Sequence, residues 1–201
     1  MHKTEAKIAS YLYVRWVIKL NLLMMTNRVI LVDKENNKIG TEEKIQAHLK
    51  SLLHRAFSIF IFNDNKEILL QKRAENKYHS GSLWTNTCCS HPYDGLSTLE
   101  CAETRLVEEM GIKTKLEEIF SFIYKESFQN GLTEYEYDHV FFGSYSSDPI
   151  LNPEEASDFK WIKINDLKND IDENPNRYTA WLKIMFTNYF KFFESYENNN
   201  M

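Results

Sequence analysis

The sequence predicts a single α+β domain in which a mixed β-sheet is sandwiched between helices, and three observations lead to this prediction. The chain has 201 residues, which is long enough for one domain with a substantial core but short for two. Apolar residues make up 43 % of it, as in globular rather than disordered chains. Strand-like runs outnumber helical runs and are not regularly separated by helices, which favours an α+β sandwich over a doubly wound sheet.

Charge and cysteine content exclude several kinds of partner. The net charge is −5 and no basic stripe interleaved with aromatic residues is visible, so we expect no nucleic-acid binding. Three cysteines, two of them adjacent, do not make a disulfide framework and indicate reduced thiols in the cytoplasm. We expect the protein to be a monomer.

The N-terminal residues do not fit the predicted domain. Residues 11–25 are largely apolar, but two basic residues interrupt the run, which makes it too short and too charged for a membrane span. The alternative is a signal peptide, although no small-residue cleavage site follows cleanly. We therefore expect no membrane partner, and we predict an N-terminal extension over 1–25, a domain over 26–196 and a polar tail over 197–201.

A hairpin and a short helix are expected first. Residues 28–33 form a β-branched run typical of a strand, and the chain resumes as a strand at Ile39-Gly40 after a polar turn. Thr41 is the expected N-cap of a helix that reaches about Lys50.

Two longer strands follow. Residues 54–62 and 67–73 are apolar runs joined by an Asn-Asp-Asn turn, which indicates a hairpin. Residues 74–83 form a polar loop. A further strand over 84–91 ends at Pro92, because proline cannot donate a hydrogen bond to a β ladder.

The clearest helix begins after Ser97. Glu100 completes a capping box with Ser97, and Gly111 ends the helix. Apolar residues at helical spacing form its expected buried stripe: Leu99, Ala102, Leu106 and Met110. The remaining expected elements are strands over 115–124, 134–144 and 159–164, a short helix over 165–171 and one long helix over 178–196.

A thiol and an imidazole lie close together before Pro92. On an extended segment residues i and i+2 point to the same side, so a strand would deliver Cys89 and His91 together to the mouth of a site. The alternative is a buried cysteine of the core beside a surface histidine, because free cysteine is among the most buried residue types.

Histidines and glutamates supply candidate metal ligands. His48, His54 and His91 come from separate elements. Glu134 and Glu136 alternate with tyrosines, so on a strand both carboxylates would face one side. Together these nitrogen and oxygen donors suit a divalent ion in octahedral coordination, namely Mn²⁺, Mg²⁺ or Zn²⁺. The alternatives are core or solvated histidines and a solvated strand face.

Four basic residues flank the proposed site elements and could hold a phosphate or diphosphate, namely Lys44, Arg73, Lys77 and Arg105. The alternative for each is an ordinary base on the protein surface. Glu108 and Glu109 lie near the C-terminus of the helix that begins after Ser97, where the helix dipole disfavours acidic side chains. We therefore expect a cation beside them, and Glu109 could carry a metal that bridges to the diphosphate.

Three runs of the chain resemble one family. L-L-H-R-A-F-S, L-W-T-N-T-C-C-S-H-P and R-L-V-E-E-M-G-I are similar to type I isopentenyl-diphosphate isomerases, a divergent branch of the Nudix fold, over residues 27–186. The resemblance implies a Nudix-like mixed sheet between helices. It also implies isomerisation of a five-carbon homoallylic diphosphate to its allylic isomer, through a tertiary carbocation in a closed, apolar pocket.

The resemblance also implies a role for individual residues. Cys89 would be the catalytic thiol, ionised with the help of nearby cations. Glu109 and the main-chain carbonyl of Cys89 would hold Mg²⁺ on the substrate diphosphate. A second divalent ion, Mn²⁺, Zn²⁺ or Mg²⁺, would be held by His48, His54, His91, Glu134 and Glu136. Glu136 would also take part in the acid–base chemistry.

Other matches concern the substrate. Lys44, Arg73, Lys77 and Arg105 would match the family's diphosphate-binding bases. Tyr124 would match the tyrosine beside the catalytic carboxylate, and Trp181 the tryptophan over the reacting carbons.

Two alternatives remain open at the level of the sequence. The first is a Nudix-type diphosphate hydrolase. The hydrolytic motif places Arg-Glu where this chain has Thr104-Arg105, which removes one carboxylate from the hydrolytic metal cluster and weakens this alternative. The second is a metal- or thiol-sensing domain that uses Cys88, Cys89 and the histidines. Neither alternative needs an aromatic lid together with a diphosphate clamp.

Overall fold

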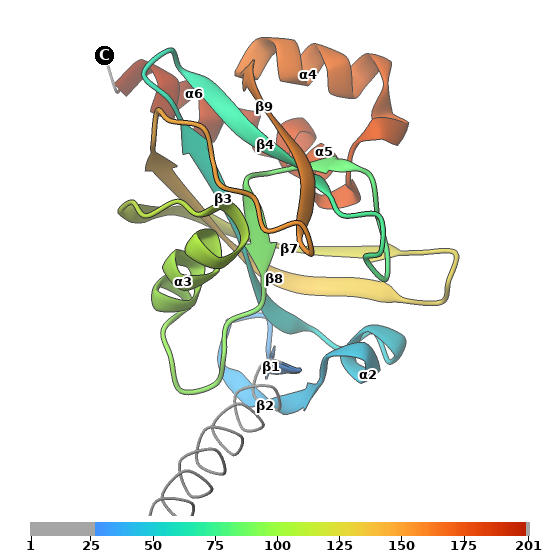
Figure 1. The fold of residues 1–201 in the computed structure, drawn as a ribbon. Helices are drawn as coiled ribbons and strands as arrows, with labels where there is room; N and C mark the ends of the chain where they lie inside the picture. The colour runs from blue at the N-terminus through green and yellow to red at the C-terminus, as the bar shows by residue number, and fades with distance from the viewer. Residues whose placement is uncertain (1–26, 200–201) are drawn as a thin grey trace, which may run out of the picture.

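The computed structural model describes residues 27–199, with side chains over 27–196. The predicted extension over 1–25 therefore lies outside the described residues. Figure 1 shows the described elements, whose bounds are β1 (Arg28–Val32), β2 (Lys38–Glu43), α2 (Lys44–Leu49), β3 (His54–Phe62), β4 (Glu67–Arg73), β5 (Trp84–Thr85), β6 (Cys88–Ser90), α3 (Thr98–Met110), β7 (Leu116–Ser127), β8 (Thr133–Ser144), β9 (Ala156–Lys163), α4 (Ile164–Glu173), a 3₁₀ turn (Pro175–Arg177), α5 (Ala180–Asn188) and α6 (Phe190–Asn199).

The sheet is mixed and β3 lies at its centre. β3 pairs in parallel with β8 along its whole length and antiparallel with β1, β4 and β6. β7 continues the sheet beyond β8, and β9 continues it beyond β4, both in antiparallel pairing. The predicted α+β class and mixed sheet are confirmed.

The two faces of β3 bury different helices. Phe57, Ile59 and Ile61 pack in a cluster that contains the buried residues of α3. Phe60 and Phe62 belong to a second cluster that contains residues of α4, α5 and α6. Figure 1 shows α3 on one side of the sheet and the C-terminal helices on the other. The period-2 alternation of a largely apolar strand thus produces a sheet sandwiched between helices.

Helix α3 confirms the predicted caps. Ser97 and Glu100 form the capping box, and Gly111 ends the helix at φ +66°, in the left-handed region that glycine adopts without strain. One stripe residue was predicted wrongly, since Leu99 is 39 % exposed. Cys101 is fully buried in the same helix and packs in the α3 cluster.

The predicted N-cap of α2 is wrong. Thr41 lies within β2, which pairs with β1 as far as the Arg28–Glu43 pair. The N-cap is Glu43, whose carboxylate accepts hydrogen bonds from the backbone N–H groups of Ile45 and Gln46. Pairing with β1 therefore outweighs the local capping preference of Thr41.

The C-terminal region contains two helices where one was predicted. α5 ends at Asn188. Its C-cap, Tyr189, has a φ of −126°, outside the helical range, and α6 begins at Phe190. The break turns the aromatic face of α6 onto the sheet, where Phe193 is fully buried. α6 also runs to Asn199, further than the expected end near Tyr196. Within residues 27–199, no helix combines the length and the apolar character that crossing a membrane requires.

Gly143 of β8 allows close packing beneath α3. A Cβ at this position would lie 2.8 Å from Cδ2 of Leu116 and 3.0 Å from the backbone oxygen of Lys115. We predict that Gly143→Ala lowers the free energy of unfolding by about 1–3 kcal/mol, as overpacking of a core does. Urea denaturation measures the change.

Gly40 provides the matched control, because a Cβ there would meet no atom within 4 Å. Gly40→Ala should change the free energy of unfolding by less than about 1 kcal/mol. Equal destabilisation by the two substitutions would contradict the packing described for Gly143.

Candidate active site

Strand register places three polar side chains next to one another. In the parallel pair His54 of β3 lies opposite Glu136 of β8, and in the antiparallel pair Tyr124 of β7 lies opposite Glu136. The Tyr124 hydroxyl is 2.7 Å from one oxygen of Glu136 and 2.7 Å from one oxygen of Glu134. A single hydroxyl proton can be donated to only one carboxylate at a time. The buried acidic pair therefore needs positive charge from elsewhere.

Three imidazoles surround this acidic pair. Nδ1 of His48 lies 2.6 Å from the Lys44 carbonyl oxygen and Nδ1 of His54 lies 2.8 Å from the Leu52 carbonyl oxygen. A carbonyl can only accept, so each Nδ1 carries the proton and each Nε2 presents a lone pair. Nε2 of His91 approaches Nε2 of His54 at 3.2 Å. The nitrogens thus converge, as the donors of a metal ion do.

Electrostatics keeps these groups in the forms that bind metal. Burial lowers the pKa of His48, and the neighbouring His54 adds to the effect. Burial, with the Lys44 ammonium, lowers the pKa of His91 to about 3. For Glu136 burial would raise the pKa, but the adjacent imidazoles of His54 and His91 outweigh it and hold the pKa well below its usual range. Neutral imidazoles face an ionised carboxylate.

The same atoms satisfy a simple fit test for a divalent ion. One donor atom from each of His48, His54, His91 and Glu136 lies within 4.8 Å of all the others. Nε2 of His48 is fully buried without a hydrogen-bond partner among the described residues. A buried lone pair without a partner is costly unless something binds it. The described residues therefore include a His/Glu group that can hold a metal.

Cys89 faces this group from β6. It lies opposite Ser58 of β3, while its neighbour Cys88 lies opposite Ile59 and packs beneath α3. The two adjacent thiols therefore point to opposite faces of the sheet. Nη1 of Arg73 is 3.9 Å from the Cys89 sulfur.

The expected ionisation of Cys89 is not found. Burial raises the pKa of the thiol well above its ordinary value of 9.0, although the Arg73 guanidinium opposes the shift, and nearby Glu109, Glu134 and Glu136 raise it further. The expectation from the sequence counted the bases near Cys89 but not the carboxylates. With the charges of the chain itself, Cys89 is a neutral thiol.

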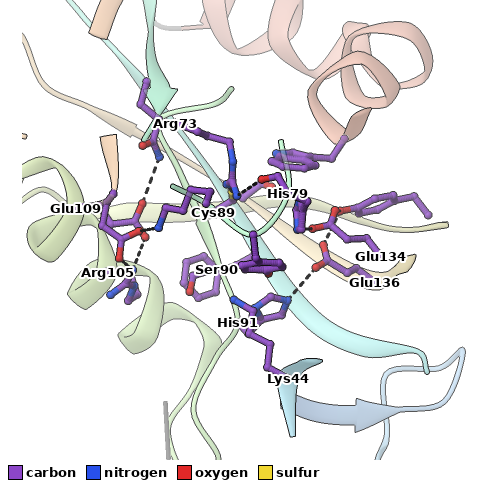
Figure 2. A pocket seen from close by; sticks show the side chains of 18 residues that line it. Lys44, Arg73, His79, Cys89, Ser90, His91, Arg105, Glu109, Glu134 and Glu136 are labelled. Atoms are coloured by element: carbon purple, nitrogen blue, oxygen red, sulfur yellow. Dashed lines mark hydrogen bonds and ion pairs between the residues drawn. The ribbon is translucent and has the colours of Figure 1, made fainter. Parts of the chain in front are cut away.

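A pocket of about 120 Å³ joins these groups. It is lined by every site residue that the sequence analysis proposed except His48 and His54, which are fully buried. In Figure 2, Cys89 lies between the Arg105–Glu109 side and the Glu134–Glu136 side of the pocket. The expectation of an apolar pocket is wrong, because most of its lining side chains are charged or polar.

Two of the four basic residues of the pocket, Lys77 and Arg105, form ion pairs with carboxylates. Arg105 donates to Glu109 at 2.6 Å and to Glu155 at 3.0 Å, and it also contacts the exposed Glu108 at 2.7 Å. Lys77 forms an ion pair with Glu155. The cation expected beside Glu108 and Glu109 is therefore Arg105 of the same helix. Lys44 and Arg73 complete the basic lining.

Trp181 of α5 closes one side of the pocket. Its indole N–H donates to the Asn86 side chain at 2.9 Å, which fixes the ring. The Arg73 guanidinium lies over the ring, 5.3 Å from its centre. The ring face can therefore already accommodate a cation.

Sequence reasoning missed seven lining residues. Phe57, Ser58 and Ser90 belong to strands that it did predict, and the other four are Gln71, Tyr78, His79 and Glu155. Gln71 lies in the largely apolar strand β4, whereas Tyr78, His79 and Glu155 lie in loops. Periodicity indicates which residues of a strand share a face, but it does not indicate where a loop folds back.

Comparison with known proteins identifies the class. A family model described as the NUDIX domain matches residues 52–182, and the mixed sheet between helices agrees with it. The protein named "Isopentenyl-diphosphate Delta-isomerase 2" from Aromatoleum aromaticum is 48 % identical over 158 residues, which cover 79 % of this chain and 84 % of that protein. "Isopentenyl-diphosphate Delta-isomerase" from Pectobacterium atrosepticum is 44 % identical over 163 residues, 81 % of this chain and 91 % of that one. The chain belongs to the isopentenyl-diphosphate Delta-isomerase family of the Nudix class.

Solved structures share the fold at much lower identity. A crystal structure of a Deinococcus radiodurans protein has a TM-score of 0.64 and 16 % identity, and covers 79 % of this chain and 96 % of that one. A MutT protein from Methanosarcina mazei has a TM-score of 0.56 and 18 % identity, with 74 % and 95 % covered. These similarities concern the fold alone.

The raised pKa of Cys89 predicts its reactivity. Alkylation by iodoacetamide requires the thiolate, so modification should be slow near neutral pH and its rate should still be rising above the ordinary value of 9.0. Mass spectrometry after brief reaction measures both the rate and the position. Cys88 and Cys101 are fully buried and serve as internal references. A rate for Cys89 that levels off at about pH 7 would mean that the thiol is already ionised there.

Proposed function

We propose that this protein interconverts isopentenyl diphosphate and dimethylallyl diphosphate by adding a proton at one carbon and removing one from another. One observation supports this most strongly: a proton-bearing thiol, Cys89, and an ionised carboxylate, Glu136, line the same pocket. A double-bond shift needs one proton donor and one proton acceptor on the same substrate. The names of the relatives give the substrate class.

The proton transfers involve three residues of this chain. Cys89 carries a proton to donate, and Glu136 can accept one. The buried hydroxyl of Tyr124 is a hydrogen-bond donor to Glu136 at 2.7 Å and can stabilise either protonation state of that carboxylate. Because the reaction is reversible, the acid and the base exchange roles in the opposite direction.

Protonation of the alkene produces a tertiary carbocation, which the pocket must protect from water. Trp181 offers a ring face to this cation and is held in place by Asn86. A cation over an aromatic ring gains about 0.5–2 kcal/mol, depending on how far water is excluded.

The basic lining suits the diphosphate. Its oxygens would be bound by Lys44, Arg73, Lys77 and Arg105. Lys77 and Arg105 would then leave their ion pairs with Glu155 and pair with the phosphate oxygens instead. Glu109 is the residue we expect to hold Mg²⁺ with the diphosphate. The metal at the His/Glu group, which we propose to be Mn²⁺, Zn²⁺ or Mg²⁺, would supply positive charge that holds Glu134 and Glu136 in place.

We further propose that the enzyme acts in the cytoplasm as a monomer. Three free cysteines agree with a reducing compartment. The isomerase domain would comprise residues 26–196.

The hydrolase alternative is weakened by Arg105. Arg105 stands at the position where a hydrolytic Nudix site has another metal-binding acid, and its guanidinium forms an ion pair with the carboxylate of Glu109. Positive charge there favours retention of the diphosphate over metal-assisted cleavage.

The direct test is turnover in deuterated water. The purified protein with isopentenyl diphosphate and Mg²⁺ should yield dimethylallyl diphosphate that carries deuterium in a methyl group. Cys89→Ala should lower kcat by at least about 10²–10⁴-fold, the contribution of a positioned acid or base, while circular dichroism and metal content stay unchanged. Cys101→Ala, on the buried face of α3, is the matched control and should retain turnover. Phosphate release without isomerisation, or an active Cys89→Ala variant, would refute the proposal.

Two substitutions separate the ring of Trp181 from its hydrogen bond. Both Trp181→Phe and Trp181→Ala lose the N–H that donates to Asn86, but only phenylalanine keeps an aromatic face. We expect kcat to fall further in the alanine variant, by an additional factor of about 2–30, the equivalent of 0.5–2 kcal/mol. Equal losses in steady-state kinetics would argue against stabilisation of the cation by the ring.

A further inference from the structure

His79 is a buried imidazole that the roles described so far leave unexplained. It lies in the loop over 74–83 between β4 and β5, and only 3 % of its side chain is exposed. The ring stacks on Phe128 with centres 4.6 Å apart and meets Trp181 edge-on at 6.0 Å. These contacts hold the imidazole in the pocket wall, where Figure 2 shows it beside Glu134.

The loop is shaped to place this ring. Ser80 and Ser82, which follow His79, have φ values of +52° and +63°, a region that L residues other than glycine rarely adopt. A side chain at Gly81 would collide with the backbone oxygen of Glu75. The carbonyl oxygen of His79 accepts a hydrogen bond from Arg73 at 3.3 Å. Unfavourable backbone geometry that surrounding contacts maintain is often found where a loop positions a functional group.

The Nε2 atom of His79 faces the acidic pair. Nε2 lies 2.9 Å from Oε1 of Glu134, yet the approach lacks the direction of a hydrogen bond, and this buried nitrogen has no hydrogen-bond partner among the described residues. Nε2 of His48 is in the same condition. One ring nitrogen from each of these histidines and a carboxylate oxygen of Glu134 lie within 4.8 Å of one another and form a second group of metal-binding geometry.

The two groups cannot hold separate ions. Both contain His48, and its single Nε2 lone pair can bind one ion. In a six-coordinate site with bonds of about 2.1 Å, neighbouring donors lie about 3 Å apart and opposite donors about 4.2 Å apart. Each group meets this limit after a small contraction, and the shared nitrogen of His48 places a single ion next to both groups.

We propose that His79 is a ligand of the metal at the His/Glu site and completes a set of six protein donors: His48, His54, His79, His91, Glu134 and Glu136. Six protein donors saturate an octahedral ion and leave no position for water. The ion then serves to fix the two carboxylates. It does not present a water molecule to the substrate.

The test uses the full chain, freed of metal with a chelator and titrated with Mn²⁺ alone. Paramagnetic resonance of free Mn²⁺ gives the dissociation constant, and the water-proton relaxation rate at saturating Mn²⁺ reports whether water reaches the ion. His79→Ala should weaken binding by about 10–100-fold or more and should increase the relaxation rate per bound ion, because water takes the open position.

Two further variants make the result specific. His79→Asn retains a polar side chain but lacks an atom at the Nε2 position, so it should behave like His79→Ala and serves if the alanine variant folds poorly. His139→Ala removes a buried imidazole of β8 that contacts Glu118 and Asn36, outside the pocket lining, and should match the wild type in both measurements.

Unchanged Mn²⁺ affinity in both His79 variants would overturn the proposal. Weaker binding with an unchanged relaxation rate would overturn it too, because His79 would then only orient Glu134. The inference rests on the proposed function for the identity of the other five ligands. The Mn²⁺ measurements need no substrate, so failure of the isomerase assay would leave their outcome readable.

Discussion

The burial of two glutamates under one tyrosine proton is the constraint on which the site depends. Glu134 and Glu136 are 5 % and 6 % exposed, and Tyr124 can donate to only one of them at a time. A buried carboxylate without compensation costs several kcal/mol, and the divalent ion that we propose at the surrounding imidazoles would supply compensating positive charge. With this compensation the carboxylate of Glu136 remains ionised inside the pocket, where it can accept a proton.

The fold meets this requirement through strand register. The parallel pairing of β3 with β8 sets His54 beside Glu136, and the antiparallel pairing of β7 sets Tyr124 beside the same residue. The short strand β6 then brings Cys89 to the opposite wall, through its pairing with Ser58. A shift of one residue in any of these ladders would turn the side chain to the other face of the sheet. Packing by α3 on one face and α5 on the other holds the register. The same strand register therefore determines both which residues form the core and which residues meet in the site.

Local patterns predicted the elements that local physics determines. The capping box at Ser97 and the glycine that ends α3 could be predicted because their partners lie within a few residues. Thr41 was misjudged because a non-local strand pairing extends through it, and the break at Tyr189 arises from packing of α6 on the sheet. In the site, the resemblance led to the residues that line the pocket, but their protonation could not be inferred. That of Cys89 depends on carboxylates from other elements, and His79 arrives on a loop whose path the sequence pattern does not indicate.

Uptake of metal by the chelator-treated protein tests the central claim most directly, because the account requires a divalent ion to compensate the buried glutamates. Thermal unfolding should be followed while Mn²⁺ is added, with the bound metal counted by elemental analysis. The account predicts one tightly bound ion per chain and a rise in Tm that corresponds to about 2.7 kcal/mol when Mn²⁺ reaches 100 times its dissociation constant. A protein that takes up no Mn²⁺ and unfolds at the same temperature with and without it would show that the carboxylates are stabilised in some other way.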